Sequence, residues 1–316
     1  MIVIERFQYT LTRLIQLIPV LFGVSIVSFL IIHLIPGDPA TIMLGPRATP
    51  ENVKELTIKM GLDKPLLNQY MIYMEGLFQG KMGDSIFFKQ SVNTLIGERL
   101  APSFFLILYA AVLSLLISIP VALYSALKKD SLMDNGFRTV SILGLSMPSF
   151  WIGIILMLLL SLKLRVFPVS GYGKSFLDHL YYLFLPALTI SFSLAPVLIR
   201  PLRSKMISVL TADFIEAARA RGLSEGSVLI RHVLRNAISG TVTILGVNIG
   251  WLLGGSVVIE TVFSVPGLGQ MLINAILTRD YPVIQGLVLV FAALVILINL
   301  ITDLCYSILD PRVELE

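Results

Sequence analysis

Charge is the first thing that this sequence lacks. Only 14% of its 316 residues are charged, whereas 56% are hydrophobic; a soluble domain carries about 25% charged residues. Six runs contain no charged residue at all, and each reaches the roughly 20 residues that a helix needs to cross the hydrocarbon core. Backbone amides in lipid must find partners within their own segment, so each run is expected to be a helix. The sequence therefore predicts an all-α polytopic membrane protein with six transmembrane helices, at 14–37, 100–127, 139–162, 180–199, 236–259 and 281–302.

The absence of Asp, Glu, Lys and Arg from these runs argues against an ion-coupled carrier. Such carriers place ionisable side chains inside the membrane, where they relay protons or ions. Of the neutral polar groups present, His33 near the outer end of the first run is the one worth testing as a relay. A hydrogen bond to a neighbouring helix is the favoured interpretation of this histidine. Energy for transport must then come from elsewhere.

Nor does the chain carry recognisable catalytic chemistry. No G-x4-G-K-[ST] sequence is present, since Gly80-Lys81 is followed by Met82 and Gly173-Lys174-Ser175 has Pro168 in place of the first glycine. Three scattered histidines and the single Cys305 offer no zinc cluster and no internal disulfide. We expect no catalytic residue, metal or cofactor in this chain. A membrane enzyme and a stand-alone channel remain as alternatives.

The cations are distributed asymmetrically between the two sides of the expected bundle. The N-terminus, the second and fourth connections and the tail carry 13 Lys and Arg residues, and the third and fifth connections carry four. Short cation-rich loops stay in the cytoplasm, and the long first connection counts little. Both termini are therefore predicted to be cytoplasmic. The net charge of +4 follows from this topology and does not indicate nucleic-acid binding; the first run is also too long for a cleaved signal peptide.

A compact polar block lies in the predicted cytoplasmic connection between the fourth and fifth runs. Its sequence predicts a short docking helix, with Thr211 as N-cap, Asp213 in the first turn and Gly222 closing it. Small residues on such a helix allow a partner to grip it closely. The block consists of Glu216, Ala217, Ala218, Arg219, Ala220, Arg221 and Gly222.

Two regions on the predicted outer side are candidates for a cap or a gate. Residues 36–99 hold seven cations and seven acids and predict helices at 50–60 and 65–77. A cap over the outer helix ends is favoured over a ligand site. The connection 260–280 is apolar yet interrupted by Phe263, Pro266 and Gly267, which predicts a short amphipathic or re-entrant segment, either in an outer gate or as an ordinary interfacial helix.

Further features lie within the spans. Pro148 predicts a kink in the third run, so that Ser146, Met147 and Trp151 line either the solute path or a packing contact. The fifth run has glycines that recur every four residues and allow close helix approach, either within the monomer or at a seam beside a pore or against a second membrane protein. These glycines are Gly246, Gly250 and Gly254.

The EAA-x3-G pattern at 216–222 resembles the cytoplasmic loop of binding-protein-dependent ABC importer permeases. Further segments along nearly the whole chain are similar to the dipeptide, oligopeptide, glutathione and nickel importer family, and to its first permease subunit. One departure is the segment 231–237, which lacks the proline of the I-x-L-P ending that is common in the wider superfamily. The matching segments are PGDPA at 36–40, GLDKP at 61–65, SMPSFW at 146–151, ETVFSVPGLG at 260–269, RDYPVIQ at 279–285 and DPR at 310–312.

The resemblance implies a type I importer architecture in a prokaryotic inner membrane. The chain would pair with a second homologous permease, two ATPase subunits that hold ATP and Mg, and an extracytoplasmic solute-binding protein. Glu216 would contact the ATPase, Ala217 and Ala218 would allow close seating, Arg219 and Arg221 would pair with acidic groups, and Gly222 would permit the turn. The favoured cargo is di- and oligopeptides, with nickel or a metal chelate as the alternative.

The same interpretation divides the chain into four parts. Residues 1–35 would hold the N-terminus and first span, and 36–99 an extracytoplasmic domain. Residues 100–302 would form a five-helix core with its coupling loop at 200–236. Residues 303–316 would form a cytoplasmic tail.

Overall fold

The computed structural model describes residues 2–34, 37–45 and 48–309, which exclude Pro36 and the DPR segment at 310–312. This part of the chain is helical, and its only β-pairing is an isolated bridge between Asp84 and Ser91. In chain order the helices are α1 (Ile2–Leu34), α2 (Pro39–Leu44), α3 (Pro50–Lys59), α4 (Leu66–Phe78), α5 (Val92–Leu127), α6 (Leu132–Ser146), α7 (Ser149–Leu156), the π-helix η2 (Met157–Lys163), α8 (Phe176–Tyr182), α9 (Phe184–Leu210), α10 (Asp213–Ala220), α11 (Glu225–Ser227), the π-helix η3 (Val228–Leu234), α12 (Arg235–Val262), α13 (Leu268–Thr278) and α14 (Tyr281–Leu309).

Several described helices are long and apolar enough to cross a membrane. Four qualify singly: α5, α9, the stretch Glu225–Val262, and α14. The pair α6 and α7–η2 makes a fifth if the two halves form one span, and α1 has a shorter apolar stretch at Ile18–Leu34. The all-α polytopic class is thus confirmed, while the count of six spans stays a prediction.

The third expected span is not one straight helix. Its two halves, Leu132–Ser146 and Ser149–Lys163, meet at 108°. Met147 between them is extended, with φ −90° and ψ 138°. Pro148 follows with φ −60° and ψ 132°, a conformation that suits proline and ends the preceding helix. The predicted kink is therefore a break, because the residue before a proline avoids helical geometry.

The helices form two compact units. The first comprises residues 1–103 and 266–297, with a core built from α1, α2, α5, α13 and the start of α14. Gly286 on α14 lets α5 come close, since a Cβ there would lie 2.6 Å from the Cγ1 of Val92. The helices predicted at 50–60 and 65–77 are present as α3 and α4. The loop between α4 and α5 is held by Asp280, which accepts hydrogen bonds from Ser85 Oγ and the amides of Ile86 and Phe87.

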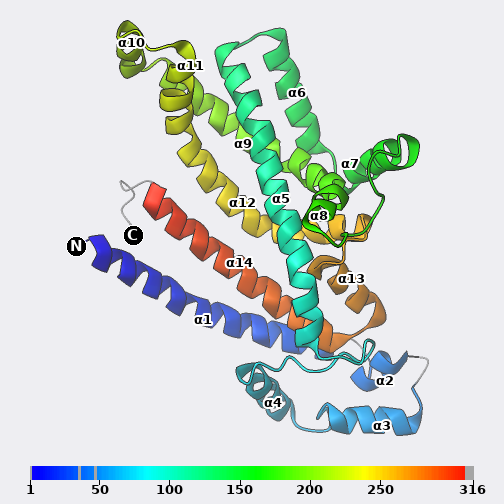
Figure 1. Ribbon diagram of the computed structural model, residues 1–316. Coiled ribbons are helices and arrows are strands. Elements are labelled where there is room, and N and C mark those ends of the chain that lie inside the picture. The colour runs from blue at the N-terminus through cyan, green and yellow to red at the C-terminus, as the bar shows by residue number, and fades with distance from the viewer. Residues whose placement is uncertain (1, 35–36, 46–47, 310–316) are drawn as a thin grey trace. The chain divides into compact units, whose positions relative to one another are not determined.

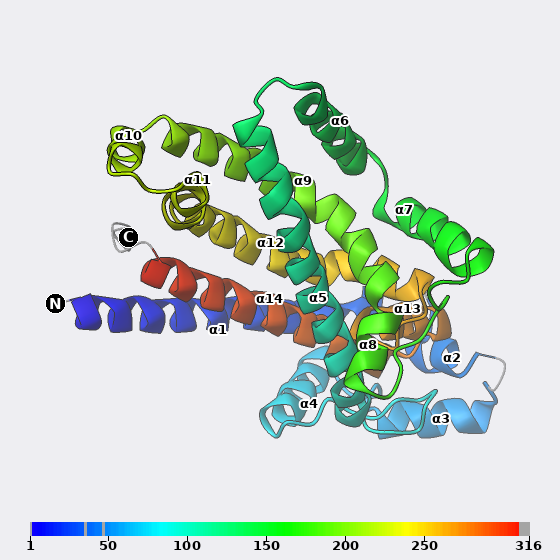
Figure 2. The same ribbon diagram turned by 45° about the horizontal axis from the view of Figure 1, so that its top comes forward.

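The second unit comprises residues 104–265 and 298–316 and has α9 at its centre. This helix contacts α6, α7 and α12, and its hydroxyl groups tie it to α5: Ser191 Oγ donates to the carbonyl of Ala110 at 3.0 Å. Figures 1 and 2 show α10 and α7 at opposite ends of α9.

Helix α8, which precedes α9 in the chain, begins with a capping box between Ser175 and Asp178. Hydrogen bonds from the Ser175 and Lys174 segment lower the pKa of the Asp178 carboxyl.

Candidate functional site

The block predicted to dock a partner folds as the short helix α10. Asp213 and Glu216 lie in its first turn, where the helix dipole favours negative charge, and Arg219 lies in the last. Gly222 ends the segment with φ +80°, a left-handed conformation that disfavours other residues.

The predicted N-cap was wrong. Ala212 occupies that position without a side-chain hydrogen bond. Thr211 ends α9 instead, and its hydroxyl donates back to Ile207 and Ser208 of that helix. A threonine near a helix end can bond to the preceding turn as readily as it can cap the next helix.

One face of α10 is buried within the chain. Ile215 and Ala218 are 0% and 7% exposed, and both belong to a core cluster that includes Val228 and Val233 of η3. This anchors the helix against the segment that leads into α12. Ala218 therefore faces inward, and the exposed members of the block are Glu216, Ala217, Arg219, Ala220, Arg221 and Gly222.

Arg219 has a partner within its own chain. Its Nε donates to Glu225 Oε1 at 2.9 Å and its Nη2 to Oε2 at 3.2 Å. The side chains of Arg219 and Glu225 are 41% and 64% exposed, so the pair contributes at most about 1 kcal/mol. Its role is geometric, because it joins the end of α10 to the start of α11 across the Gly222 turn.

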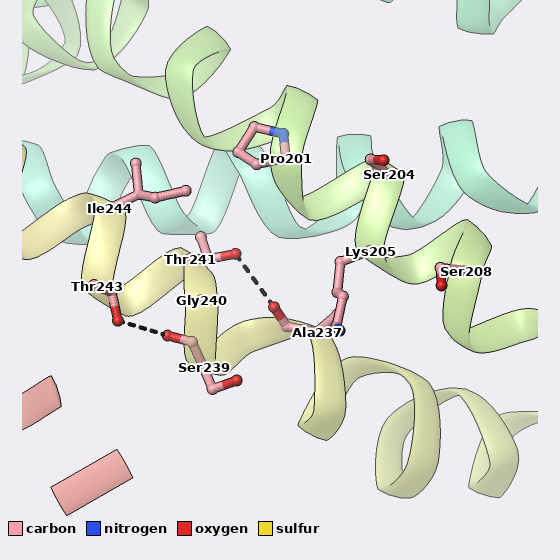
Figure 3. Close-up of a pocket in the computed structure, with 10 residues that line it drawn as sticks. All are labelled: Pro201, Ser204, Lys205, Ser208, Ala237, Ser239, Gly240, Thr241, Thr243 and Ile244. Carbon is pink, nitrogen blue, oxygen red and sulfur yellow. Dashed lines mark hydrogen bonds between the residues drawn. The ribbon is translucent and has the colours of Figure 1, made fainter. Parts of the chain in front are cut away.

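A polar cavity of about 590 Å³ lies between the end of α9 and the start of α12. Figure 3 shows its ten lining residues. Lys205 is the one charged side chain among them, and hydroxyl groups come from Ser204 and Ser208 on α9 and from Ser239 and Thr243 on α12. The cavity thus offers a cation and several hydrogen-bonding groups at the end of the unit that carries α10. Sequence reasoning missed it, because its residues come from two segments that only the fold brings together.

Near the cavity, α6 is tied to α9 by a buried carboxylate. Asp134 is 0% exposed and accepts from Arg203, from the backbone amide of Asp130 and from Arg138. Asp134 also lies in the first turn of α6, which is one half of the bent pair. The loop after α5, the helix α6 and the end of α9 therefore share one polar centre.

The residues at the bend predicted to line a path or gate are exposed in this chain. Ser146, Met147, Pro148 and Trp151 all lie on its surface. Phe263, the candidate for an outer gate, is buried at 1% exposure. Its ring packs on α7, where a Cβ at Gly153 would lie 3.0 Å from Phe263 Cε2.

The remaining gate candidates flank the start of the helix expected in the fifth connection. Gly267 is the N-cap of α13 and is buried, whereas Pro266 is half-buried. The Leu268 amide donates to Ser103 Oγ at 2.8 Å. The structure thus brings the bend and Phe263 together through α7.

Two buried carboxyl groups were missed because they lie just outside the charge-free runs. Glu260 is 0% exposed in the last turns of α12, and Asp280 is 1% exposed before α14. Helix α12 continues past residue 259, so the end of an apolar run did not mark the end of the helix.

His33 bonds through Nε2 to Gln69 Oε1 of α4 at 3.0 Å, as the favoured interpretation expected. No cluster of three His, Cys, Asp or Glu residues suited to a metal occurs in the described ranges.

Two family models match most of this chain. Residues 118–315 match the family described as binding-protein-dependent transport system inner membrane component. Residues 6–91 match the N-terminal domain of the same class of membrane components. The chain belongs to the family of binding-protein-dependent ABC importer permeases.

Similar permeases are known from several bacteria. The oligopeptide transport system permease protein AppB of Bacillus subtilis is 39% identical over 312 residues, covering 97% of this chain and 99% of AppB. The dipeptide transport system permease protein DppB of Escherichia coli is 37% identical over 334 residues, covering 97% and 98%. Among solved structures, the inward-facing MetNI methionine ABC transporter matches with a TM-score of 0.56 at 17% identity, covering 68% of this permease and 96% of that chain. That likeness shows the permease fold.

Proposed function

We propose that this permease imports di- and oligopeptides across a prokaryotic inner membrane. The observation that carries the proposal is likeness along almost the whole chain to permeases named for peptides, including the di/tripeptide permease DppB of Pseudomonas aeruginosa at 40% identity. The relatives described here are named for peptide transport, so we do not carry the nickel alternative forward.

The motor would be supplied by separate subunits. The sequence has no P-loop of its own, which supports ATP and Mg on two partner ATPases. Helix α10 presents Glu216, Ala217 and Arg221 at its surface while Ile215 and Ala218 hold it to the core. An ATPase that grips the exposed face would move η3 and α9 with it. Both termini and α10 lie in the cytoplasm in this proposal.

The polar cavity would form the inner part of the solute path, shared with a second permease. Its single cation and surrounding hydroxyl groups suit a zwitterionic peptide, because hydroxyls can donate and accept and the ammonium attracts a carboxylate. An extracytoplasmic binding protein would deliver the cargo.

Uptake in cells that lack this gene tests the proposal. Restoring the gene together with its neighbours should restore ATP-dependent accumulation of labelled di- and tripeptides. Purification of the tagged chain should recover a second permease and two ATPases. Restored nickel accumulation without peptide accumulation would overturn the cargo, and conduction by the chain alone would overturn the mechanism.

A further inference from the structure

The two helices between α2 and the loop before α5 differ sharply in surface chemistry. In α3, four of ten residues are charged: Glu51, Lys54, Glu55 and Lys59. Helix α4 has thirteen residues and one charge, Glu75. Its surface is apolar, since Leu67, Met71 and Phe78 are 69%, 63% and 84% exposed. Helix α3 has a surface suited to water, and α4 does not.

Helix α4 is attached to the outer half of α1. Tyr70 and Ser25 share a hydrogen bond of 2.8 Å between their hydroxyl oxygens, and Tyr73 and Ser28 share another of 2.8 Å. The Tyr70 ring also lies against Phe29 at 5.3 Å and Phe22 at 6.2 Å between ring centroids. The ring therefore sits at the level of Ser25 on α1. Figure 1 shows α4 beside the end of α1.

The depth of this attachment follows from the length of α1. If the hydrocarbon core begins at Leu14, after Arg13, a rise of 1.5 Å per residue places Ser25 about 16 Å and Ser28 about 21 Å into a core about 30 Å thick. Ser28 is then about 9 Å below the outer boundary of the core, and Ser25 about 13 Å below it.

Helix α14 provides a second measure of the same depth. Gln285 Nε2 donates to the carbonyl of Ser28 at 3.2 Å. The apolar part of α14 begins at Tyr281, directly after Asp280, so Gln285 lies about 6 Å inside that end. Two helices that run in opposite directions thus place Ser28 below the outer boundary by similar amounts.

A tyrosine side chain reaches only about 6 Å from its backbone, so neither hydrogen bond can be made from a helix held well above the membrane surface. We propose that α4 is embedded in the outer leaflet and that lipid acyl chains cover Leu67 and Met71. The apolar face of α4 then continues the lipid-facing surface of α1, where Val27 is 59% exposed at the same level. Lys64 and Lys81 flank α4 in the chain, and lysine side chains at the edge of an apolar segment are long enough to reach the headgroups. This inference rests on α1 crossing the membrane and is independent of the cargo.

Single-cysteine variants of the assembled transporter test this placement. In a Cys305→Ser background, spin labels at Leu67→Cys and Met71→Cys are compared with Lys54→Cys on α3 and Val27→Cys on α1, in vesicles of phosphatidylethanolamine and phosphatidylglycerol. Collisions with oxygen report lipid, and collisions with a neutral, water-soluble nickel chelate report water. We expect the α4 positions to match Val27, with nickel-chelate collisions at least about tenfold rarer than at Lys54.

Each other outcome is informative. Labels on α4 that collide with the nickel chelate as often as Lys54 would overturn the proposal and place α4 in water. Rare collisions with both probes would also overturn it, because a protein would then cover α4. A water-exposed Val27 would refute the depth of α1 itself and leave the assignment as a peptide permease untouched.

Discussion

Arg203 on α9 donates two parallel hydrogen bonds to Asp134 on α6, from Nε to Oδ1 at 3.0 Å and from Nη2 to Oδ2 at 2.7 Å. The carboxylate is fully buried and the arginine side chain is 16% exposed. Two-point contact of this kind fixes orientation as well as distance. Movement at the end of α9 must therefore reach α6.

Removing the charge of Asp134 should be costly. In Asp134→Asn, Arg203 loses its counter-charge in a mostly buried place, and breaking such a pair costs about 3–5 kcal/mol. Thermal unfolding of the purified transporter should show the loss. The matched control is Arg138→Ala, which removes a half-exposed partner of the same carboxylate and should cost about 0–1 kcal/mol. Equal losses in the two variants would contradict the buried character of the Arg203 pair.

The turn after α10 depends on one backbone conformation. Gly222 has φ +80°, which proline cannot adopt, so Gly222→Pro should abolish uptake while the protein remains in the membrane. Glu216→Lys should do the same by reversing a charge on the exposed face of α10. Gly226→Ala is the control, since a Cβ there meets nothing within 4 Å. Normal peptide uptake in Gly222→Pro would disprove the docking role.

Filling the polar cavity should block the solute path without unfolding the chain. Ser239→Trp places a large ring in a space of about 590 Å³, and we expect peptide uptake to fall at least about tenfold. Leu132→Trp adds the same ring at a residue that is 91% exposed and should leave uptake unchanged. ATP hydrolysis by the purified complex shows whether the ATPase subunits are still active. Unimpaired uptake in Ser239→Trp would remove the cavity from the path.

Two glycines of α12 should respond oppositely to the same substitution. Gly→Ala within a helix stabilises by about 0.5–1 kcal/mol when there is room, as at Gly240, where a Cβ meets nothing within 4 Å. At Gly246 a Cβ would collide with the side chain of Thr302 on α14, so Gly246→Ala should destabilise by about 1–3 kcal/mol. Thermal unfolding measures both changes. Adding Thr302→Ala to Gly246→Ala should restore stability, and no rescue would show that the collision with Thr302 is not the cause of the loss.

The sequence predicted apolar runs well and helix ends less well. Hydropathy reports which residues tolerate lipid, whereas an end depends on local bonds: α5 begins at Val92, eight residues before its charge-free run, where Ser91 Oγ accepts from the Thr94 amide. The same limit hid Glu260, because α12 continues to Val262, beyond the end of the charge-free run at residue 259. Pro148 predicted a kink in the third span. The 108° angle between its halves depends on how α6 and α7 each pack against α9.

For the site, local pattern was enough to find α10 but not to orient it. Nothing in the block itself distinguishes Ala217, which is exposed, from Ala218, which lies on the buried face of α10. The side that is buried depends on Val228 and Val233, and these lie beyond the turn. The cavity between α9 and α12 required the tertiary structure, since each of its hydroxyl residues alone is an ordinary helix position.

Helix α9 is long enough to act as a lever arm. Its 27 residues span about 40 Å at 1.5 Å per residue, and its end at Leu210 lies just before α10. A tilt of about 10° over that length displaces the far end by about 7 Å, more than one helical turn. Pro196 and Pro201 lie inside α9 and remove backbone hydrogen bonds near its middle. The helix can therefore bend there. A tilt that starts at α10 would therefore produce its largest displacement at the α7 end, and the two prolines would set where the helix bends.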